Sequence, residues 1–414
     1  MKILHLNIRA SQGGAGRMAL DLHQRLVFAG VDSRLIYGYA SGIADDPAVT
    51  GKGSIRRLAN KASVLGNYAS HVVAGFDLFT ANKKMLDEGI SWCDVAHLHV
   101  PHHYFMNWDF FCRTILRYRK PLVITAHDWW FITGRCAIVE QCAGWQRGCG
   151  ECGSMRFRDL PSVFDFSRIH RKRKAASLKA LSGLVTIVCP SVHLSLGYRQ
   201  ALKDVPIHVI PNSIDLDFEN ARSLAGEANI NRKGFVFSAA DLSSSGKIDR
   251  ELVIDLLRSG DVEVQLIGRN NPFEGMEATC FGEVRDREKM ANILRSARAL
   301  VFCSRMDNAP LTIIEALVAG CFVLAYDSPA AREILANVGG KCISDRAAMI
   351  DVIRRNDMEL LYGGISSTEL AKRARSVYSG NTTSRKYLEI YQSLVEGDAL
   401  SHGEAILRAG TIGL

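Results

Sequence analysis

The sequence predicts an α/β protein with two domains, each built on a parallel β-sheet. Short apolar segments alternate with segments of helical periodicity along most of the 414 residues, which is typical of β-α-β units. The pattern runs once through residues 2–210 and restarts near residue 234. At about 100–200 residues per domain, the length fits two or three domains that each bury a core. Open α/β sheets bind ligands at the C-terminal ends of their strands, so we expect a ligand cleft where two such sheets would face each other.

The first series contains six expected strands and one well-marked helix. The strands are expected at residues 2–8, 33–37, 94–99, 121–126, 183–189 and 207–210. A glycine-rich turn over residues 11–16 follows the first strand, and apolar spacing then predicts a helix over residues 18–28.

The second series repeats the alternation. Strands are expected at 234–239, 262–267, 299–303 and 322–326, with helices at 249–257, 287–297 and 311–319. The polar, weakly patterned stretch 211–233 predicts the domain joint. We therefore expect an N-terminal domain over 1–211, a second domain over 212–385, and a C-terminal helix and tail over 386–414 that packs back toward the first domain.

Composition narrows the class of protein. With 47% hydrophobic and 23% charged residues, the chain is not expected to be disordered or of low complexity. No apolar stretch predicts a membrane span, and the N-terminus lacks the pattern of a signal peptide. We therefore expect a cytoplasmic protein whose 11 cysteines are thiols or metal ligands rather than disulfides.

A basic run lies between Arg156 and Lys179, where eight Arg or Lys residues accompany only two acidic ones. The formal net charge of the chain is +8. Such a run is typical of a solvated helix face, and it also suits contact with an acidic ligand or an anionic membrane. A peripheral position on the inner face of the cytoplasmic membrane is therefore one expectation, and no nucleic-acid partner is expected.

The glycine loop Gly13-Gly14-Ala-Gly16 follows the first strand and opens a helix. Glycines let the backbone approach an anion, and a helix N-terminus offers unpaired N–H groups. A tight turn selected for packing explains the same residues. The second strand ends without the acidic residue that dinucleotide enzymes use for the ribose, which disfavours a nicotinamide cofactor.

Asp307 and Glu315 are the most informative pair, eight positions apart around the start of the expected helix 311–319. Unpaired backbone N–H groups near residues 308–311 would suit a diphosphate. Glu315, about one turn further, offers two oxygens that can accept both hydroxyls of a ribose. Because a buried carboxylate without partners is costly, a ligand role is favoured over an exposed or capped helix carboxylate.

These residues resemble the donor-binding signature of the retaining GT-B glycosyltransferases of family 4. Further matches occur in the same order, at 2–16, 97–101, 125–128 and 210–215. The Asp-Asn-x-Pro variant beginning at Asp307 resembles a subgroup that assembles bacterial exopolysaccharides, the colanic-acid type included. The resemblance implies a GT-B fold of two facing Rossmann-like domains with a central cleft.

The resemblance also implies roles for individual residues. Glu315 would hold the nucleotide ribose, Asp307 would face the donor sugar, and His127 would lie beside the reacting carbon. The diphosphate would meet Lys247 and the backbone of Gly13 and Gly14. Further backbone contacts to the donor would come from Val284, Asn308, Ala309, Pro310 and Leu311. The catalytic set would thus be His127, Asp307 and Lys247.

One position departs from the family pattern. The arginine that usually accompanies the lysine on the diphosphate is replaced by Asp241. This leaves Arg305 and Arg269 as candidates to supply the second positive charge.

The activity implied is transfer of a sugar, with retention, from a UDP- or GDP-sugar to a glycan or lipid-linked acceptor, without a catalytic cofactor. The helix-end amides and cations would stabilise charge on the departing diphosphate. Two alternatives remain: a non-catalytic nucleotide-sugar-binding protein, and another enzyme on the same architecture, such as a phosphorylase or an epimerase.

Four cysteines form a second unusual feature: Cys136, Cys142, Cys149 and Cys152 lie within 17 residues. Four thiolates in a loop could form a closed, structural zinc site. Free buried thiols or a disulfide formed under oxidation are the alternatives. The loop follows closely on His127, so it would shape the acceptor side of the cleft.

Histidines and aromatic residues near these motifs admit two interpretations each. His97, His99, His102 and His103 suggest a metal site, but histidines at a strand end are more often packed or hydrogen-bonded. The aromatic residues could stack on acceptor sugars or form the core of the loop; they are Trp129, Trp130, Phe131 and Trp145.

Overall fold

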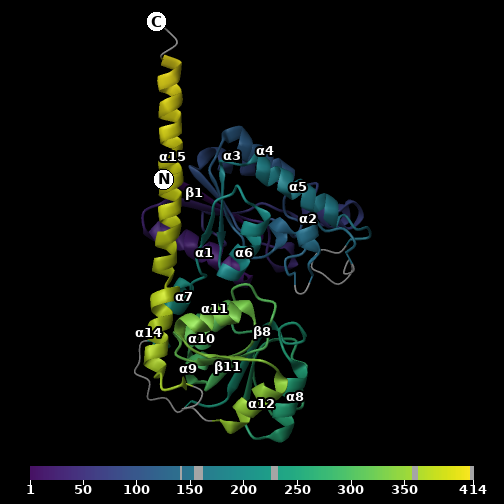
Figure 1. Cartoon of the computed structure of the whole chain (residues 1–414), viewed down its shortest axis with the longest axis vertical. Helices are drawn as coiled ribbons and strands as arrows, with labels where there is room; N and C mark the ends of the chain where they lie inside the picture. Colours follow the sequence, from purple (N-terminus) through teal and green to yellow (C-terminus); the bar gives the residue numbers. More distant parts are fainter. Residues whose placement is uncertain (140–141, 153–161, 225–231, 357–361, 411–414) are drawn as a thin grey trace. The chain divides into compact units, whose positions relative to one another are not determined.

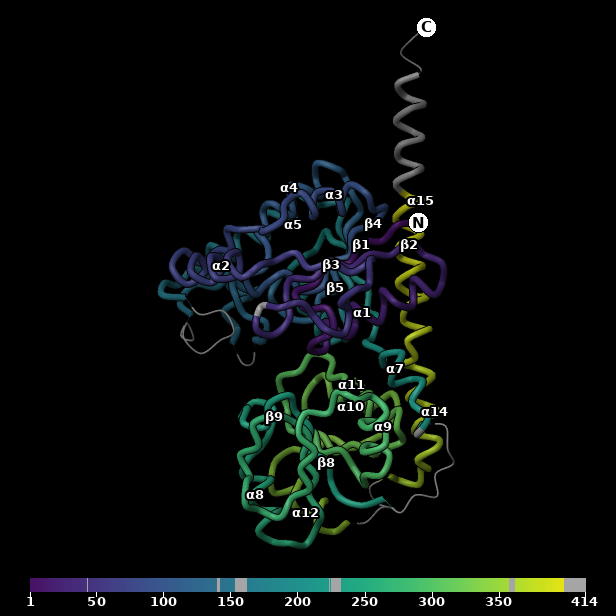
Figure 2. Tube along the Cα trace, turned by 180° about the vertical axis from the view of Figure 1, so that it is seen from behind, coloured from purple at the N-terminus to yellow at the C-terminus, as the bar shows by residue number. Residues whose placement is uncertain are grey.

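The structure, a computed structural model, describes residues 1–139, 142–152, 162–224, 232–356 and 362–410, with side chains up to residue 397 except at 43 and 223. The chain forms two compact units. Unit 1 comprises Met1–Ile210 and Thr383–Leu414, and unit 2 comprises Pro211–Thr382 (Figures 1 and 2). The boundaries expected from the sequence, after residues 211 and 385, lie within three residues of these.

Unit 1 is built on a seven-stranded parallel sheet in the order β3-β2-β1-β4-β5-β6-β7. The strands are β1 Lys2–Asn7, β2 Asp32–Tyr37, β3 Ile55–Arg57, β4 Val95–Leu98, β5 Leu122–Thr125, β6 Val185–Cys189 and β7 Ile207–Val209. The helices are α1 Gly13–Phe28, α2 Lys61–Ala74, α3 Lys83–Trp92, α4 Trp108–Tyr118, α5 Ser167–Ala180, α6 Val192–Ala201 and α15 Gly380–Gly410. Short 3₁₀ turns are η1 Ser41–Ile43, η2 Trp130–Ile132 and η3 Gly144–Arg147.

Both faces of this sheet are covered, and the alternation of side chains along the strands decides what each face packs against. On β1, Leu4 and Leu6 join a core formed with α3, α4, α5 and α6. Ile3 points to the opposite core, which contains Leu22 and Leu26 of α1. Because both faces are buried, the strands read as nearly continuous apolar runs, the signal used to predict them.

The C-terminal helix α15 belongs to unit 1 from Thr383 onward. Its residues Tyr387 and Tyr391 are buried in the core that contains Ile3 and the α1 side chains. Figure 1 shows α15, in yellow, running beside α1. The end of the chain thus completes one face of the first sheet.

Unit 2 contains a six-stranded parallel sheet in the order β10-β9-β8-β11-β12-β13. Its strands are β8 Phe235–Asp241, β9 Val264–Arg269, β10 Thr279–Gly282, β11 Ala299–Phe302, β12 Phe322–Tyr326 and β13 Lys341–Ile343. Its helices are α7 Leu216–Glu219, α8 Arg250–Ser259, α9 Arg287–Ser296, α10 Leu311–Val318, α11 Pro329–Val338, α12 Arg346–Arg355 and α14 Ser367–Tyr378, with the 3₁₀ turn η4 Arg222–Leu224. Helix α10 packs against α9, α11 and α14, and α8 packs against α12.

The sequence-based boundaries differ from the structure in two respects. Helix α1 begins at Gly13, not at residue 18, so the predicted glycine turn forms the first helical turn. Three strands were missed, β3, β10 and β13, and each lies at an edge of its sheet. Edge strands are short and pair on one side only, which weakens their apolar pattern.

The strand orders locate the ligand-binding edge of each unit. In unit 1 the order reverses between β1 and β4, and in unit 2 between β8 and β11. The loops that follow these strand pairs lie at the topological switch points, where open α/β sheets bind ligands. Among the described residues, no helix is long and apolar enough to span a membrane.

Candidate active site

The switch point of unit 2 brings Lys247 and Asp307 together. Lys247 follows β8 and Asp307 follows β11, and Lys247 Nζ donates to Asp307 Oδ1 at 2.6 Å. Their side chains are 37% and 25% exposed, so both remain accessible to a ligand. The contact places a cation and a carboxylate at the edge where a donor is expected.

The N-terminus of α10 lies directly after Asp307. Pro310 is the N-cap residue and makes no side-chain cap, and the first turn contains no acidic residue. Asn212 holds the preceding loop, since its Nδ2 donates to the carbonyl of Ala309 at 2.9 Å. A helix start without a side-chain cap suits an anion, as predicted for Asn308–Leu311. Sequence reasoning did not assign a role to Asn212, although the Pro-Asn-Ser motif marked its position.

Gly320 follows the C-cap residue of this helix, Ala319. Its φ is +69°, in the left-handed region, and a Cβ there would lie 2.5 Å from Ser367 Oγ. Glycine is therefore required at this position by both backbone conformation and space.

Glu315 is buried, with 3% of its surface exposed, and it has a protein partner. Arg287 at the start of α9 donates to Glu315 Oε1 at 2.6 Å, and the same guanidinium reaches Asp215 Oδ2 at 3.0 Å. The argument that this carboxylate needs a ligand because it lacks a partner is therefore wrong, since Arg287 compensates its charge. Its role on a ribose stays a prediction.

The other donor residues of unit 2 fall around the same edge. Val284 follows the end of β10 and is half-buried. Asp241, at the end of β8, accepts from Ser243 and from Asn270 Nδ2, so it shapes the turn that precedes Lys247. These hydrogen bonds, that of the Ser243 hydroxyl first, hold the pKa of Asp241 below its usual value.

The two arginines suggested as replacements contact carbonyl groups. Arg305 donates to Ser344 O at 2.8 Å and lies over the Tyr326 ring, and Arg269 donates to Ala240 O at 3.3 Å. Arg305 lines a cavity of about 600 Å³ together with Gly246 and Met306, the sequence neighbours of Lys247 and Asp307. Arg305 is thus next to the predicted donor residues, whereas Arg269 is not among the lining residues.

In unit 1, Gly13 and Gly14 are exposed in the first turn of α1, at the switch point beside β1. Gly13 has φ +73°, and no atom would meet a Cβ built there. The glycine is required by conformation, and the open space leaves room for a ligand to approach the backbone.

His127, in the loop after β5, ends a chain of three imidazoles that begins with His5 of β1. His5 Nδ1 lies 3.4 Å from His99 Nε2, and His99 Nδ1 lies 3.2 Å from His127 Nε2. Burial lowers the pKa of His127 to about 4, so the ring is neutral near pH 7. A neutral imidazole oriented by a neighbour suits a hydrogen-bonding role on a sugar.

His5, His97 and His99 have ligand nitrogens within 4.8 Å of one another, the arrangement that a metal needs. Both nitrogens of His97 already have partners, Thr125 Oγ1 at 2.7 Å and Tyr391 OH at 2.6 Å. His97 is therefore hydrogen-bonded on both sides, the interpretation favoured for strand-end histidines, whereas His5 Nε2 is buried without a hydrogen-bond partner among the described residues.

The cysteine loop does not gather its thiols for a metal. Within the described residues, no three of the four cysteines place their sulfurs within 4.8 Å of one another. Cys142 is exposed, and Cys149 Sγ accepts from Gly134 N at 3.2 Å. A zinc ion would have to draw the loop together, and the zinc site stays a prediction.

The aromatic residues near His127 divide into two groups. Trp129, Phe131 and Trp145 are buried in the core of unit 1, as the loop-core interpretation predicts. Trp130 is only half-buried. Beside it, Asp128 Oδ2 accepts from His102 Nε2 at 2.9 Å, and Asp128 Oδ1 accepts from Trp130 N at 2.8 Å.

The basic run is not uniformly solvated. Arg156 and Arg158 lie outside the described residues. On α5, Arg168 and Lys172 are exposed, but Lys174 is buried at 3% exposure. The sequence pattern did not distinguish this buried lysine from its neighbours.

Family models match both units of the chain. The model described as Glycosyltransferase Family 4 matches residues 12–218, and that described as Glycosyl transferases group 1 matches residues 274–376. The chain belongs to glycosyltransferase family 4. As a family 4 glycosyltransferase it is a transferase, and the non-catalytic alternative gains no support.

The relatives of this family 4 glycosyltransferase agree in fold and length. The putative colanic acid biosynthesis glycosyl transferase WcaC of Escherichia coli K12 is 30% identical over 95% of this chain and 100% of its own. Among solved structures, sucrose-phosphate synthase from Thermosynechococcus elongatus has 15% identity, a TM-score of 0.62, and coverage of 96% and 100%. Anabaena HepE in complex with UDP has 15% identity, a TM-score of 0.61, and coverage of 95% and 100%. These likenesses show the GT-B fold.

Proposed function

We propose that this family 4 glycosyltransferase transfers a sugar, with retention of anomeric configuration, from a nucleotide-sugar to a glycan or lipid-linked acceptor in bacterial polysaccharide biosynthesis. The contact between Lys247 Nζ and Asp307 Oδ1 at 2.6 Å carries the proposal. The contact places a cation and a carboxylate beside the start of α10 at one switch point. These are the groups that binding of a nucleotide-sugar requires, the cation and the helix start for the diphosphate and the carboxylate for the sugar.

The chemistry of donor cleavage explains these residue types. The departing nucleoside diphosphate gains negative charge, which Lys247 and the amide groups at the start of α10 would stabilise. The sugar gains oxocarbenium character, which the carboxylate of Asp307 would stabilise. Glu315 would accept the ribose hydroxyls, and the backbone of Val284 would meet the base.

A uridine nucleotide is the donor that the comparisons favour. HepE has been solved with UDP and with UDP-glucose, at TM-scores of 0.61 and 0.59 to this chain. WcaC, by its name, acts in colanic acid biosynthesis. We therefore propose a UDP-sugar as donor and an intermediate of an exopolysaccharide as acceptor.

A donor screen followed by a transfer assay tests the proposal. Thermal unfolding with UDP-glucose, UDP-galactose, GDP-mannose and GDP-fucose should show stabilisation by a UDP-sugar, because ligand binding to the folded state raises its stability. Nucleoside diphosphate release should then depend on added lipid-linked saccharides, and NMR of the product should show the anomeric configuration of the donor. Donor binding without product on any acceptor would favour a non-catalytic binding protein.

We also propose that unit 1 contacts an anionic membrane through α5 and neighbouring apolar side chains. Arg168 and Lys172 are exposed on α5, and Ile169 between them is 49% exposed. Val163 and Phe164, just before α5, are each 59% exposed. In a flotation assay, the protein should float with vesicles of anionic lipids at low salt. At high salt, which screens the charges, it should dissociate from the vesicles. Equal flotation with neutral vesicles would contradict an electrostatic contact.

A further inference from the structure

Unit 1 contains a second cavity, of about 60 Å³, between the loop after β4, the start of α4, and α5. Roughly 10–15 Å³ of such volume suffices for one water molecule, so the cavity has room for a carboxylate or a phosphate group. Its charged lining residues are Arg135, Arg173, Lys174, Asp77 and Asp109. Four histidines also line it: His71, His102, His103 and His170.

Lys174 is the buried cation of this cavity. Its Nζ donates to the carbonyls of Trp130 and Gly134, and it lies 3.8 Å from the centroid of the Trp130 ring. No acidic side chain of the described residues forms an ion pair with it. Burial lowers its pKa to about 7. Its hydrogen-bond acceptors are neutral carbonyls, and the effect of burial on its pKa outweighs that of the nearby Asp128 carboxylate. The ammonium is therefore incompletely compensated, and an anion beside it would add the missing charge.

The buried nitrogens of the lining without a hydrogen-bond partner in the described structure include Trp108 Nε1 and His102 Nδ1. The Trp108 indole can only donate. His102 donates its Nε2 proton to Asp128, which leaves its Nδ1 as a hydrogen-bond acceptor in the neutral ring. A buried donor left without an acceptor is costly, and the Trp108 indole N–H would be satisfied by an oxygen atom in the cavity.

The acidic side chains of the cavity are already engaged by protein groups. Asp77 accepts from His71 Nδ1 at 3.1 Å and from Tyr104 N at 3.0 Å. Asp109 is paired with Arg173. The remaining charge of the lining is positive.

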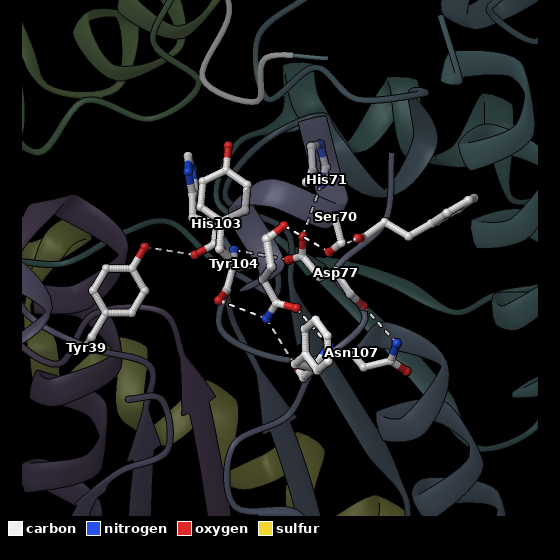
Figure 3. A network of polar contacts seen from close by, with 10 residues as sticks. Tyr39, Ser70, His71, Asp77, His103, Tyr104 and Asn107 are labelled. Carbon is white, nitrogen blue, oxygen red and sulfur yellow. Dashed lines mark hydrogen bonds and ion pairs between the residues drawn. The ribbon is translucent and has the colours of Figure 1, made fainter. Parts of the chain in front are cut away.

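One wall of the cavity is held in a strained conformation. His103 and Tyr104 have φ values of +70° and +69°, which non-glycine residues rarely adopt. Figure 3 shows the contacts that maintain them: Tyr39 OH donates to His103 O at 2.9 Å, and Tyr104 N donates to Asp77. In the same view, Asn107 Nδ2 donates to Asp77 O at 2.8 Å, which ties the start of α4 to this wall. Strained backbone of this kind clusters at ligand sites, where it fixes the geometry in advance.

We propose that this cavity binds an oxyanion, a carboxylate or a phosphate, through Lys174 and Trp108, and that the oxyanion belongs to the acceptor. The attribution to the acceptor rests on the proposed function, whereas binding of the anion does not. A uronic acid or a phosphorylated carrier would both present the required group.

An NMR titration of the full chain tests the proposal directly. The Trp108 indole signal is assigned with Trp108→Phe, and the protein is titrated with inorganic phosphate, glucuronate and glucose. We expect a saturable shift of this signal with phosphate or glucuronate and none with glucose. Preference for glucuronate indicates a uronic-acid acceptor, and preference for phosphate a phosphorylated one. Absence of a saturable shift with both anions overturns the proposal.

Lys174→Met should lower the affinity for the anion at least about tenfold, the range expected for loss of a charge-assisted hydrogen bond. Lys172→Met, on the exposed face of the same helix, is the matched control and should leave the affinity unchanged. If Lys174→Met does not fold, calorimetry on Trp108→Phe takes its place and should show a loss of affinity. Equal affinity in wild type and either cavity variant contradicts the site. If the cavity binds the anion but the protein transfers no sugar, the anion site is supported and the proposed function is wrong.

Discussion

Arg287 and Glu315 form a buried ion pair inside unit 2, with Arg287 NH2 2.6 Å from Glu315 Oε1 and side chains 15% and 5% exposed. Burial alone would lower the pKa of Arg287, but Glu315 and Asp215 raise it above its ordinary value. The pair fixes the orientation of the Glu315 carboxylate from α9, the helix that follows Val284. The carboxylate predicted to hold a ribose is therefore positioned before any donor binds.

Replacing Glu315 by alanine should lower turnover by about tenfold or more. The fold should survive, because Arg287 retains Asp215 as a partner. Steady-state kinetics with the donor found in the screen, together with circular dichroism, measure both effects. Glu396→Ala, at an exposed position of α15, is the control. Unchanged donor hydrolysis and transfer in Glu315→Ala would show that this acid does not serve the donor.

Lys247→Met should reduce turnover about a hundredfold, the usual effect of removing one group that stabilises a developing anion. The donor KM should change much less, since the diphosphate gains its extra charge only as the bond breaks. Lys289→Met, exposed on α9, controls for the loss of a surface charge. A rise in donor KM at constant turnover would assign Lys247 to ground-state binding alone.

The parallel sheets could be predicted from sequence because their central strands are buried on both faces. Strands such as β5 and β6 are apolar runs bounded by turns, and the structure confirms them within one or two residues. The edge strands β3 and β10 were missed because they carry polar, exposed residues. One-sided pairing does not impose an apolar pattern.

The candidate site was predictable where a motif marks the backbone and unpredictable where long-range pairing decides. Gly320 and the start of α10 follow from local signals. The partner of Glu315 is 28 positions away, and no local pattern connects the two. Lys174 has the same residue type as its exposed neighbour Lys172, and only packing against Trp130 separates them.

The buried lysine should make stability depend on pH between about 7 and 9. Burial lowers the pKa of Lys174 to about 7 from its ordinary value of 10.5, so above pH 7 the unfolded state binds more protons than the folded state. Stability therefore rises with pH across this window, by up to about 1.4 kcal/mol per unit. Among the neighbouring groups, Asp128 and Cys149 raise the pKa of Lys174 and Arg171 lowers it, by less than burial does. Urea unfolding of wild type and Lys174→Met at pH 7, 8 and 9 measures this effect. The free energy of unfolding should rise with pH only in the wild type, and the same rise in both proteins would contradict the role of Lys174.

Acid should destabilise unit 1 through its buried histidines. Burial, with repulsion among the rings, holds the pKa values of His5, His97 and His99 well below 6.5. Below pH 6.5 these histidines bind protons in the unfolded state but not in the folded state. The free energy of unfolding therefore falls as the pH decreases. The urea midpoint should drop between pH 7 and 5, and His5→Leu should reduce the drop. His208→Gln, at an exposed position of β7, is the control and should leave the drop in the urea midpoint unchanged. If the midpoint of His5→Leu drops as much as that of the wild type, the explanation is wrong.

The cysteine loop should bind zinc only by rearranging, since no three of its thiols now lie within 4.8 Å in the described residues. Burial raises the pKa of Cys149, and a bound ion would have to displace that proton. If zinc is structural there, protein purified without added metal should hold about one ion per chain, because such sites retain their metal. Cys142→Ser should abolish the bound zinc. Cys280 is exposed in unit 2, and Cys280→Ser should leave the zinc content unchanged. A content below about 0.2 zinc per chain would leave the four residues as free thiols.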